Sequence, residues 1–325
     1  MSKTLKIKYI ESGSFDPWLN LACEEYMLNN IKEDEIVFYL WQNDKTVVIG
    51  ANQNPWKECD VNLLEKEEGK LARRMSGGGA VYHDLGNLNF TFIVDKNYYD
   101  FFKQVKVIID ALQEMGISAD FSGRNDIIVN NRKISGNAFY HSNKGSIHHG
   151  TILVNSDFNQ LVKYLQVSKD KIKSKGIESV RSRVINLKDV SSLINIEDLK
   201  KNLKIYFAIN YGNYEHITFD DLDSHEITEL YNKYASWDWK FGDTPKFAVS
   251  ITKRFEWGEL NVNLNLDKGI IKDVKIYSDA MDPNIGDNIK RFLLDVPLNK
   301  VNSRLDKEEI DNEVKEWIVS ELKNL

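Results

Sequence analysis

The chain has 325 residues, of which 42% are hydrophobic and 28% charged, a composition typical of a globular protein. Its length predicts one large domain with room for a smaller one, at roughly 100–200 residues per domain. No stretch approaches the ~18 consecutive apolar residues of a membrane span. The basic start lacks the apolar segment of a signal peptide, and a net charge of −6 disfavours nucleic-acid binding. Cys23 and Cys59 are too few for a disulfide framework, so we expect a reducing, cytoplasmic location.

Helices and strands follow one another irregularly along the first 240 residues. Asp16 and Pro17 predict the start of an amphipathic helix that runs to residue 28. Strands at 36–41 and 46–49 flank Asn43-Asp44, as in a hairpin. The elements expected after them are a helix at 61–68, strands at 80–83 and 88–94, a helix at 101–115 ended by Gly116, strands at 126–129, 132–135 and 148–154, and helices at 196–206 and 224–234.

The order of these elements predicts an α+β fold. Because strands do not alternate strictly with helices, we expect a mixed, mainly antiparallel sheet with flanking helices rather than a doubly wound sheet. The pattern breaks around residues 237–245. We therefore predict a large domain over residues 1–244 and a small α+β domain over residues 245–325. The small domain is expected to hold strands at 247–255, 259–266 and 270–276 and helices at 285–293 and 307–325.

Residues 73–84 read RRMSGGGAVYHD and form a candidate anion site. Three consecutive glycines lose extra backbone entropy on folding, so they suit a place where the backbone must approach a ligand and offer N–H groups. A flexible turn between strands is the plainer interpretation of such a run. The arginines before it favour the anion site, because guanidinium suits carboxylate and phosphate groups. The spacing matches neither a Walker loop nor the dinucleotide-binding fingerprint.

A second cluster joins residues 123–126 (GRND), 132–138 (RKISGNA) and 148–151 (HHGT). Asp126 and Lys133 fall on the two arms of a predicted hairpin, so they could face one pocket. Alone, Lys133 would be read as a solvated surface lysine. His148 and His149 point to opposite faces of a strand, and no further Cys/His cluster completes a zinc site.

A third segment, residues 171–187, is basic within an acidic protein. A charge run of this kind is usually a solvated face. Its position after two candidate anion sites also suits a mobile lid over phosphates.

Together, the three segments resemble the lipoate-protein ligase A family of the biotin/lipoate ligase superfamily. The resemblance covers residues 5–250, whereas residues 251–325 match mainly in length and order of elements. It implies a biotin/lipoyl ligase-like catalytic domain with a C-terminal accessory domain. It also implies a two-step reaction, in which lipoate attacks the α-phosphorus of ATP to give lipoyl-AMP and pyrophosphate, and an acceptor lysine then takes the lipoyl group.

The resemblance assigns roles to residues that match the family's motifs. Lys133 would be catalytic, neutralising the carboxylate and α-phosphate and later stabilising the oxyanion. Asp126 would be the Mg²⁺ ligand, since a hard cation prefers oxygen. ATP and the adenylate would be bound by Arg74, Gly79, Ala80, Val81, Tyr82, Asn125, Asp126, Lys133, Lys175 and Val184. Lipoate would be bound by Trp41, Arg74, His83, Lys133 and His149.

The expected partners are apo lipoyl domains of 2-oxoacid dehydrogenase E2 subunits, the glycine-cleavage H protein, or both, with no nucleic acid and no membrane. Octanoyl or lipoyl transferases of the same fold are the alternative, but they work through a cysteine thioester. Cys23, in the first helix, and Cys59, before the glycine run, are badly placed for it. A biotin ligase has a different arginine and glycine pattern, and a non-catalytic lipoate-binding module would not need Lys133.

Overall fold

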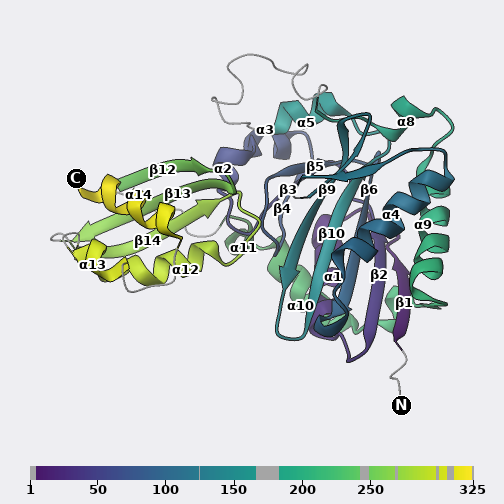
Figure 1. Cartoon of the computed structure of the whole chain (residues 1–325), viewed down its shortest axis with the longest axis horizontal. Helices are drawn as coiled ribbons and strands as arrows, with labels where there is room; N and C mark the ends of the chain where they lie inside the picture. The colour runs from purple at the N-terminus through teal and green to yellow at the C-terminus, as the bar shows by residue number, and fades with distance from the viewer. Residues whose placement is uncertain are drawn as a thin grey trace. The chain divides into compact units, whose positions relative to one another are not determined.

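The chain divides into two compact units, each described here by itself (Figure 1). The computed structural model describes residues 5–123, 125–165, 183–241, 249–267, 270–297, 300–305 and 311–323. The first unit comprises Met1–Ile49, Pro55–Arg74 and Ala80–Lys240, and the second comprises Gly50–Asn54, Met75–Gly79 and Phe241–Leu325. Short segments at 50–54 and 75–79 thus group with the C-terminal part of the chain. The domain boundary after residue 244 stays a prediction.

The first unit is built on an eight-stranded sheet with the order β11-β1-β2-β6-β10-β9-β8-β7. Strand β1 pairs in parallel with β2 and β11, and the other pairings in this sheet are antiparallel. The predicted mixed, mainly antiparallel sheet is therefore confirmed. The strands are β1 (Lys6–Glu11), β2 (Glu35–Trp41), β6 (Asn87–Asp95), β7 (Asp120–Ser122), β8 (Asp126–Val129), β9 (Arg132–His141), β10 (Gly145–Leu153) and β11 (Glu215–His216).

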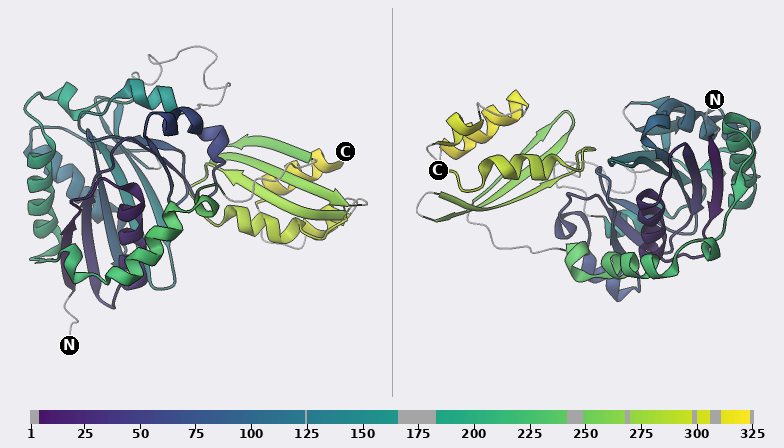
Figure 2. Two further views of the ribbon diagram at one scale, coloured as in Figure 1. Left: turned by 180° about the vertical axis from the view of Figure 1, so that it is seen from behind. Right: turned by 90° about the horizontal axis from the view of Figure 1, so that it is seen from below.

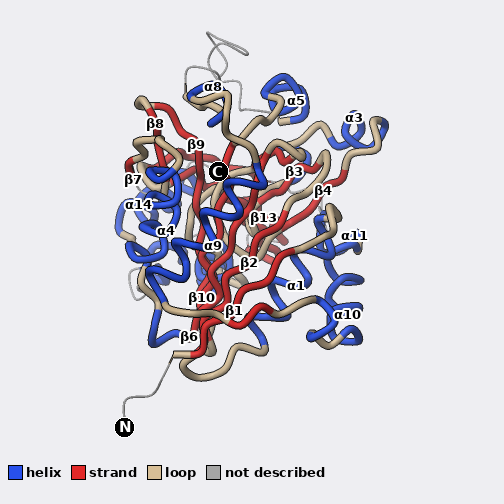
Figure 3. Tube along the Cα trace, turned by 90° about the vertical axis from the view of Figure 1, so that its right-hand side faces the viewer, coloured by secondary structure: helices blue, strands red, loops and turns tan. Residues whose placement is uncertain are grey.

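Helices cover both faces of this sheet (Figure 3). On one face, α4 (Phe101–Glu114) and α9 (Ile196–Tyr211) bury their apolar side chains against the sheet in one large core. On the other face lie α1 (Pro17–Asn29) and α10 (Ser224–Ala235). As predicted, Asp16 begins α1, because its carboxylate accepts the N–H groups of Trp18 and Leu19.

A small three-stranded sheet, β4-β3-β5, completes the first unit. Its strands are β3 (Thr46–Ile49), β4 (Lys70–Arg73) and β5 (Val81–His83), with β4 parallel and β5 antiparallel to β3. The shorter helices are α2 (Pro55–Glu58), α3 (Val61–Lys66), α5 (Phe158–Tyr164) and α8 (Leu187–Val190), and the chain leaves the unit along α11 (Trp237–Phe241).

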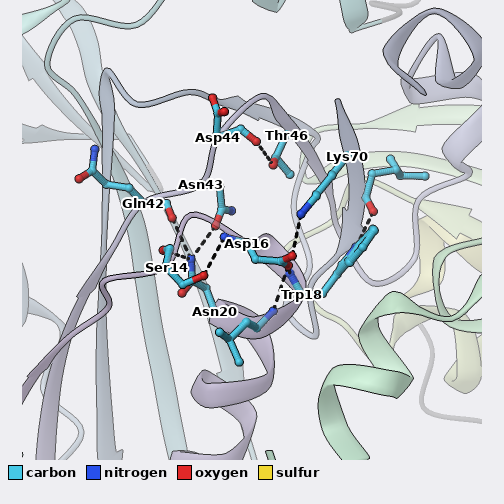
Figure 4. Close-up of polar contacts among 11 residues, drawn as sticks. Ser14, Asp16, Trp18, Asn20, Gln42, Asn43, Asp44, Thr46 and Lys70 are labelled. Atoms are coloured by element: carbon cyan, nitrogen blue, oxygen red, sulfur yellow. Dashed lines mark hydrogen bonds and ion pairs between the residues drawn. The ribbon is translucent and has the colours of Figure 1, made fainter. Parts of the chain in front are cut away.

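The predicted hairpin between residues 36–41 and 46–49 is wrong. Strand β2 pairs with β1 and β6, whereas β3 pairs with β4 and β5. The cause is a buried polar anchor: Asn20 Nδ2 on α1 donates to Gln42 O at 2.8 Å and to Asn43 Oδ1 at 3.0 Å (Figure 4). The segment that resembles a tight turn is instead held against α1, and it carries the chain from one sheet to the other.

The second unit is an antiparallel sheet covered by helices (Figure 2). One core joins the sheet to all three helices. The segments at 50–54 and 75–79 group with it through backbone bonds, such as Gly78 N to Ala280 O at 2.7 Å and Ser278 N to Asn52 O at 2.7 Å. The elements are β12 (Val249–Phe255), β13 (Gly258–Asp267), β14 (Ile270–Ser278), α12 (Ile285–Leu293), α13 (Val301–Leu305) and α14 (Asn312–Lys323). Across the described ranges, every helix is too short or too polar to cross a membrane.

A buried histidine lies inside the first unit's core. His148 on β10 is fully buried, stacks on the ring of Phe92, and lies between the side-chain amides of Gln104 and Asn137, each 2.9 Å from one ring nitrogen. Burial, with a smaller contribution from the nearby His149, lowers its pKa to about 3. The imidazole is therefore neutral at physiological pH.

We predict that His148 makes the first unit sensitive to acid. In the unfolded chain it takes up a proton at its usual pKa near 6.5, but in the folded protein only near pH 3. The unfolded state then binds more protons, so the free energy of unfolding falls as the pH drops below about 6.5. Between pH 7 and pH 5, the wild type should lose about 2 kcal/mol more than His148→Gln.

Urea unfolding followed by circular dichroism at the two pH values measures this difference. The other ionisable groups and the second unit are common to both proteins, so their contributions cancel. Equal losses in the wild type and the variant would show that His148 does not carry the acid sensitivity.

Candidate functional site

The candidate site occupies the face of the eight-stranded sheet that α1 covers. Strand β10 alternates as predicted for neighbouring residues: His148 contacts Gln104 on α4, whereas His149 contacts Glu24 on α1. Thr151 follows on the same side as His149. In the register of β10 with β6, His149 is opposite Thr91 and Thr151 is opposite Asn89. Four polar side chains thus line one face of two central strands.

Lys133 and Asp126 form an ion pair at one end of this face. They lie on the paired strands β9 and β8, as predicted, with Lys133 Nζ 2.8 Å from Asp126 Oδ1. Their side chains are 35% and 36% exposed, so a solute can reach both. A Cβ atom added to Gly136 would lie 2.7 Å from Lys133 Nζ. The missing side chain at Gly136 therefore provides the space that the lysine amine occupies.

The backbone around Lys133 is held on both sides. Its N–H donates to Arg183 O at 2.7 Å, and its carbonyl accepts from Ile185 N at 3.0 Å. Val184, a predicted adenylate contact, thereby forms a bridge beside Lys133. Asn125, another predicted contact, is bound through its side-chain amide to Asn137 O at 3.1 Å. Lys175 lies outside the described residues.

A buried carboxylate joins most of the predicted lipoate contacts. Glu24 on α1 is 1% exposed, and its Oε1 accepts from the Thr91 hydroxyl at 2.7 Å and from His149 Nδ1 at 2.8 Å. The indole N–H of Trp41 donates to the same Thr91 hydroxyl at 3.0 Å. Sequence analysis missed both Glu24 and Thr91. The available signal for Glu24 is its position four residues after Asn20, which places the two polar side chains on the same face of the helix.

Arg74 is buried near this carboxylate. Its backbone N–H donates to Ile49 O at 3.0 Å, and its Nη1 donates to Val48 O at 3.2 Å. Burial lowers its pKa to about 10, and attraction to Glu24 opposes that shift. The guanidinium therefore keeps its charge at neutral pH, and it lies in a region from which water is largely excluded.

His83 supplies a directed hydrogen-bond donor to the same region. Asn20 fixes the amide of Asn43 (Figure 4). The Nδ2 of Asn43 then donates to His83 Nδ1 at 3.1 Å. Burial and, to a smaller extent, the positive charge of Arg74 lower the pKa of His83 to about 3, so the ring is neutral. Because Nδ1 accepts from Asn43, the proton of the ring is on Nε2.

Two buried polar atoms of this region have no hydrogen-bond partner within the described part of the chain. They are His83 Nε2 and Glu24 Oε2. Leaving a buried polar group unpaired costs about 1–3 kcal/mol, so such a group usually marks a place where a ligand or water binds. The buried cluster is therefore suited to a ligand with polar atoms.

The ion pair and the buried cluster are parts of one site. Gly136 N donates to Thr151 Oγ1 at 3.2 Å, and Thr151 is opposite Asn89 in the strand register. Asn89 Nδ2 in turn lies 3.5 Å from His83 Nδ1. Polar groups thus follow one another along this face of the sheet, from Gly136 beside Lys133 to His83.

The three glycines of residues 77–79 have different roles in the structure. Gly77 is packed so closely against the carbonyl groups of Ala280 and Met281 that a side chain would collide with them, and Gly78 has a φ of +90°. Gly79 is exposed and has open space where a Cβ would lie. Packing therefore explains Gly77, a positive φ explains Gly78, and Gly79 is the one with an exposed backbone.

The next three predicted ATP contacts follow Gly79 in the first unit. Ala80 leads into β5, where Val81 and Tyr82 pair with β3. Tyr82 is buried, and its ring centroid lies 5.6 Å from that of Tyr164 on α5.

Both thiols are unsuited to nucleophilic catalysis. Cys23 and Cys59 are at most 1% exposed, and burial raises the pKa of each to about 12. Among the described residues, no group of three or more His, Cys, Asp or Glu side chains could enclose a metal ion. Asp126 is a single half-exposed carboxylate, so it could give a cation only one of its ligands.

Two family models match this chain over most of its length. Residues 16–208 match the lipoyl protein ligase A/B catalytic domain, and residues 244–325 match the bacterial lipoate protein ligase C-terminus. Lipoate-protein ligase A of Psychrobacter cryohalolentis is 39% identical to this chain, with 98% of this chain and 99% of the relative covered. Lipoate-protein ligase A of Blochmanniella floridana is 38% identical, with 91% and 90% covered.

Solved structures give the same result. The structure of P. falciparum LipL1 in complex with lipoate has a TM-score of 0.85 and 33% identity, and the match covers 97% of this chain and 99% of that one. A lipoate-protein ligase A bound with ATP has a TM-score of 0.64 and 25% identity, with 74% and 99% covered. A bi-partite ligase of Thermoplasma acidophilum, described with its E2 lipoyl domain, has a TM-score of 0.67 and 27% identity, with 76% and 99% covered. The chain therefore belongs to the lipoate-protein ligase A family.

Proposed function

We propose that this chain activates lipoate with ATP and transfers the lipoyl group to a lysine of an acceptor protein. The observation that carries the proposal is the Lys133 amine, held by Asp126 over Gly136, from which polar groups follow one another along the sheet face toward the buried Arg74–Glu24 cluster. The P. falciparum relative was solved with lipoate and another with ATP, which supports both substrates.

In the first step, a carboxylate oxygen of lipoate attacks the α-phosphorus of ATP. The new O–P bond forms as the bond between the α-phosphorus and the bridging oxygen breaks, and pyrophosphate leaves with the electron pair. Two anions must approach each other, so fixed positive charge lowers the barrier. We assign this role to Lys133, whose amine is accessible and is already placed by Asp126.

In the second step, the neutral amine of an acceptor lysine attacks the carbonyl carbon of lipoyl-AMP. A tetrahedral intermediate forms, AMP leaves with the electron pair of the broken C–O bond, and the proton of the former amine passes to the departing phosphate or to water, which leaves the amide. Lys133 would stabilise the oxyanion of this intermediate. The same side chain thus serves both steps without forming a covalent bond.

Trp41, Arg74, His83 and His149 would line the lipoate pocket together with Lys133. Trp41, Arg74, His83 and His149 are each less than a tenth exposed, and Glu24 is bound by His149 directly and by Trp41 through the Thr91 hydroxyl. These bonds, and the bond from Asn43 to His83, hold the three rings in place before substrate arrives. Such preorganised side chains bind a ligand without first being ordered.

ATP and the adenylate would contact Gly79, Ala80, Val81, Tyr82, Asn125, Asp126, Val184 and, by resemblance, Lys175, together with Arg74 and Lys133. Mg²⁺ usually binds through one or two carboxylates, substrate phosphates and water. Asp126 fits this pattern as a single accessible carboxylate. Bound there, the ion would neutralise phosphate charge.

We expect the acceptors to be apo lipoyl domains of E2 subunits, the glycine-cleavage H protein, or both. The T. acidophilum ligase, described with its E2 lipoyl domain, supports the first of these. Two free, buried thiols suit a reducing, cytoplasmic location. We expect no membrane and no nucleic-acid partner. The thioester route of octanoyl and lipoyl transferases is disfavoured because neither thiol is accessible.

We predict that Lys133→Ala abolishes adenylate formation while the fold is retained. The Lys133 side chain is about one-third exposed, so its removal leaves no closed cavity in the core. The lipoate carboxylate and the α-phosphate, however, would approach each other without a positive charge between them. Lipoate-dependent pyrophosphate release should fall by roughly a hundredfold or more. Lys106→Ala is the control, because Lys106 also forms an ion pair, to Asp110 at 2.7 Å, but on α4 across the sheet. Wild-type pyrophosphate release by folded Lys133→Ala would remove Lys133 from the mechanism.

We also predict that Gly136→Ala impairs the reaction with Lys133 intact. The added methyl group would lie 2.7 Å from Nζ and 2.9 Å from Cε, so the amine must move away. Misplacing a catalytic group by about 1 Å can cost about a hundredfold, so we expect a rate loss of roughly ten- to a hundredfold. Gly13→Ala, where a methyl group meets nothing within 4 Å, is the matched control. Equal rates for the two variants in the same pyrophosphate assay would contradict the assigned position of the amine.

A further inference from the structure

Two tryptophan side chains close the free edge of strand β4. Within the described residues, β4 pairs with β3 on one side alone. On its other side, Trp18 Nε1 donates to Leu71 O at 3.0 Å, and Trp239 Nε1 donates to Arg73 O at 2.9 Å. These two carbonyls are two residues apart, so both point away from β3. The indoles take the place that a neighbouring strand would have.

Trp239 and Arg73 are joined by two hydrogen bonds, in each of which the side chain of one residue donates to the backbone carbonyl of the other. The Arg73 side chain is buried and donates to the last carbonyls of α11, from Nε to Trp239 O at 2.9 Å and from Nη2 to Lys240 O at 2.7 Å. The indole of Trp239 returns a bond to Arg73 O. We call these contacts the Arg73–Trp239 latch. It joins segments 166 residues apart in the sequence.

The latch binds the carbonyl oxygen of the peptide group between Arg73 and Arg74. The carbonyl of this peptide, Arg73 O, accepts from Trp239, and its N–H, on Arg74, donates to Ile49 O at 3.0 Å. Both polar atoms of one peptide are therefore fixed from opposite sides. The Arg74 guanidinium starts from this backbone and reaches the buried region near Glu24.

Trp18, on α1, can be compared with Trp239 because its indole also donates to a carbonyl of β4. Its bond to Leu71 O has nearly the same length, but that carbonyl belongs to the peptide before Ala72 and not to the one before Arg74. Each indole also has a lysine amine over its ring. These are Lys70 at 5.0 Å (Figure 4) and Lys240 at 4.6 Å for Trp18, and Lys233 at 4.2 Å for Trp239. Loss of either indole N–H should therefore lower the free energy of unfolding by a similar amount.

We propose that Arg73 and Trp239 are positioning residues that set the affinity for lipoate through Arg74. The latch fixes the backbone from which the Arg74 guanidinium projects, so that substrate meets a cation that is already placed. The inference rests on the proposed function, because it requires Arg74 to contact lipoate.

The test compares Trp239→Phe with Trp18→Phe. Each keeps an aromatic ring and removes one indole N–H from the edge of β4. For Trp239→Phe we expect the KM for lipoate to rise about tenfold, the change that the loss of one hydrogen bond produces. Its kcat at saturating substrates should stay within about twofold of the wild type, because Lys133 is untouched. Trp18→Phe should leave the KM for lipoate unchanged. Its thermal unfolding temperature should fall by about as much as that of Trp239→Phe.

Arg73→Lys gives an independent measurement. A lysine keeps the charge but lacks the fork that reaches two carbonyls, so the KM for lipoate should rise as in Trp239→Phe. This variant decides the matter if Trp239→Phe does not fold.

Two outcomes separate the latch from the proposed function. An active wild type, with equal lipoate KM values for Trp239→Phe and Trp18→Phe, would overturn the latch alone. A wild type that forms no adenylate would contradict the proposed function and, with it, the role of the latch in lipoate affinity.

Discussion

The site depends on the buried carboxylate of Glu24. A charge with 1% exposure is tolerated only when it is paired and hydrogen-bonded, and Glu24 meets this need with Thr91, His149 and the nearby positive charge of Arg74. These partners come from β6, β10 and the end of β4, and Glu24 itself comes from α1. The contacts of this one carboxylate therefore join α1, the eight-stranded sheet and the three-stranded sheet at the place where lipoate is proposed to bind.

The two parts of the site differ in a way that suits adenylation. The buried part holds the neutral ring of His83 and the charged guanidinium of Arg74 in fixed orientations, because low exposure leaves them few alternatives. The part with Lys133 and Asp126 is about one-third exposed, which leaves access for ATP and for an acceptor lysine. A rigid pocket for the acyl substrate beside an accessible cation matches a reaction in which one substrate stays bound while its partner is exchanged.

Sequence reasoning predicted what depends on local patterns. The α+β class, the start of α1 at Asp16 and the two arms that carry Asp126 and Lys133 follow from strand and turn signals and were confirmed. The hairpin around Asn43 was wrong, because a buried contact with Asn20 overrode its turn preference. Glu24 and Thr91 were missed since their importance comes from partners far away in the sequence. Likewise, Gly77 and Gly78 are glycines because of packing and a positive φ, which a motif alone does not reveal.

The central claim is ATP-dependent transfer of lipoate to a protein lysine. The most direct measurement is the intact mass of an apo E2 lipoyl domain and of apo glycine-cleavage H protein after incubation with this chain, lipoate and Mg-ATP. Matched reactions omit ATP or replace free lipoate and ATP with an octanoyl carrier protein. The account predicts a mass increase of one lipoyl group on at least one acceptor, only when ATP is present. Modification without ATP, from the acyl carrier alone, would contradict it and identify an acyl transferase.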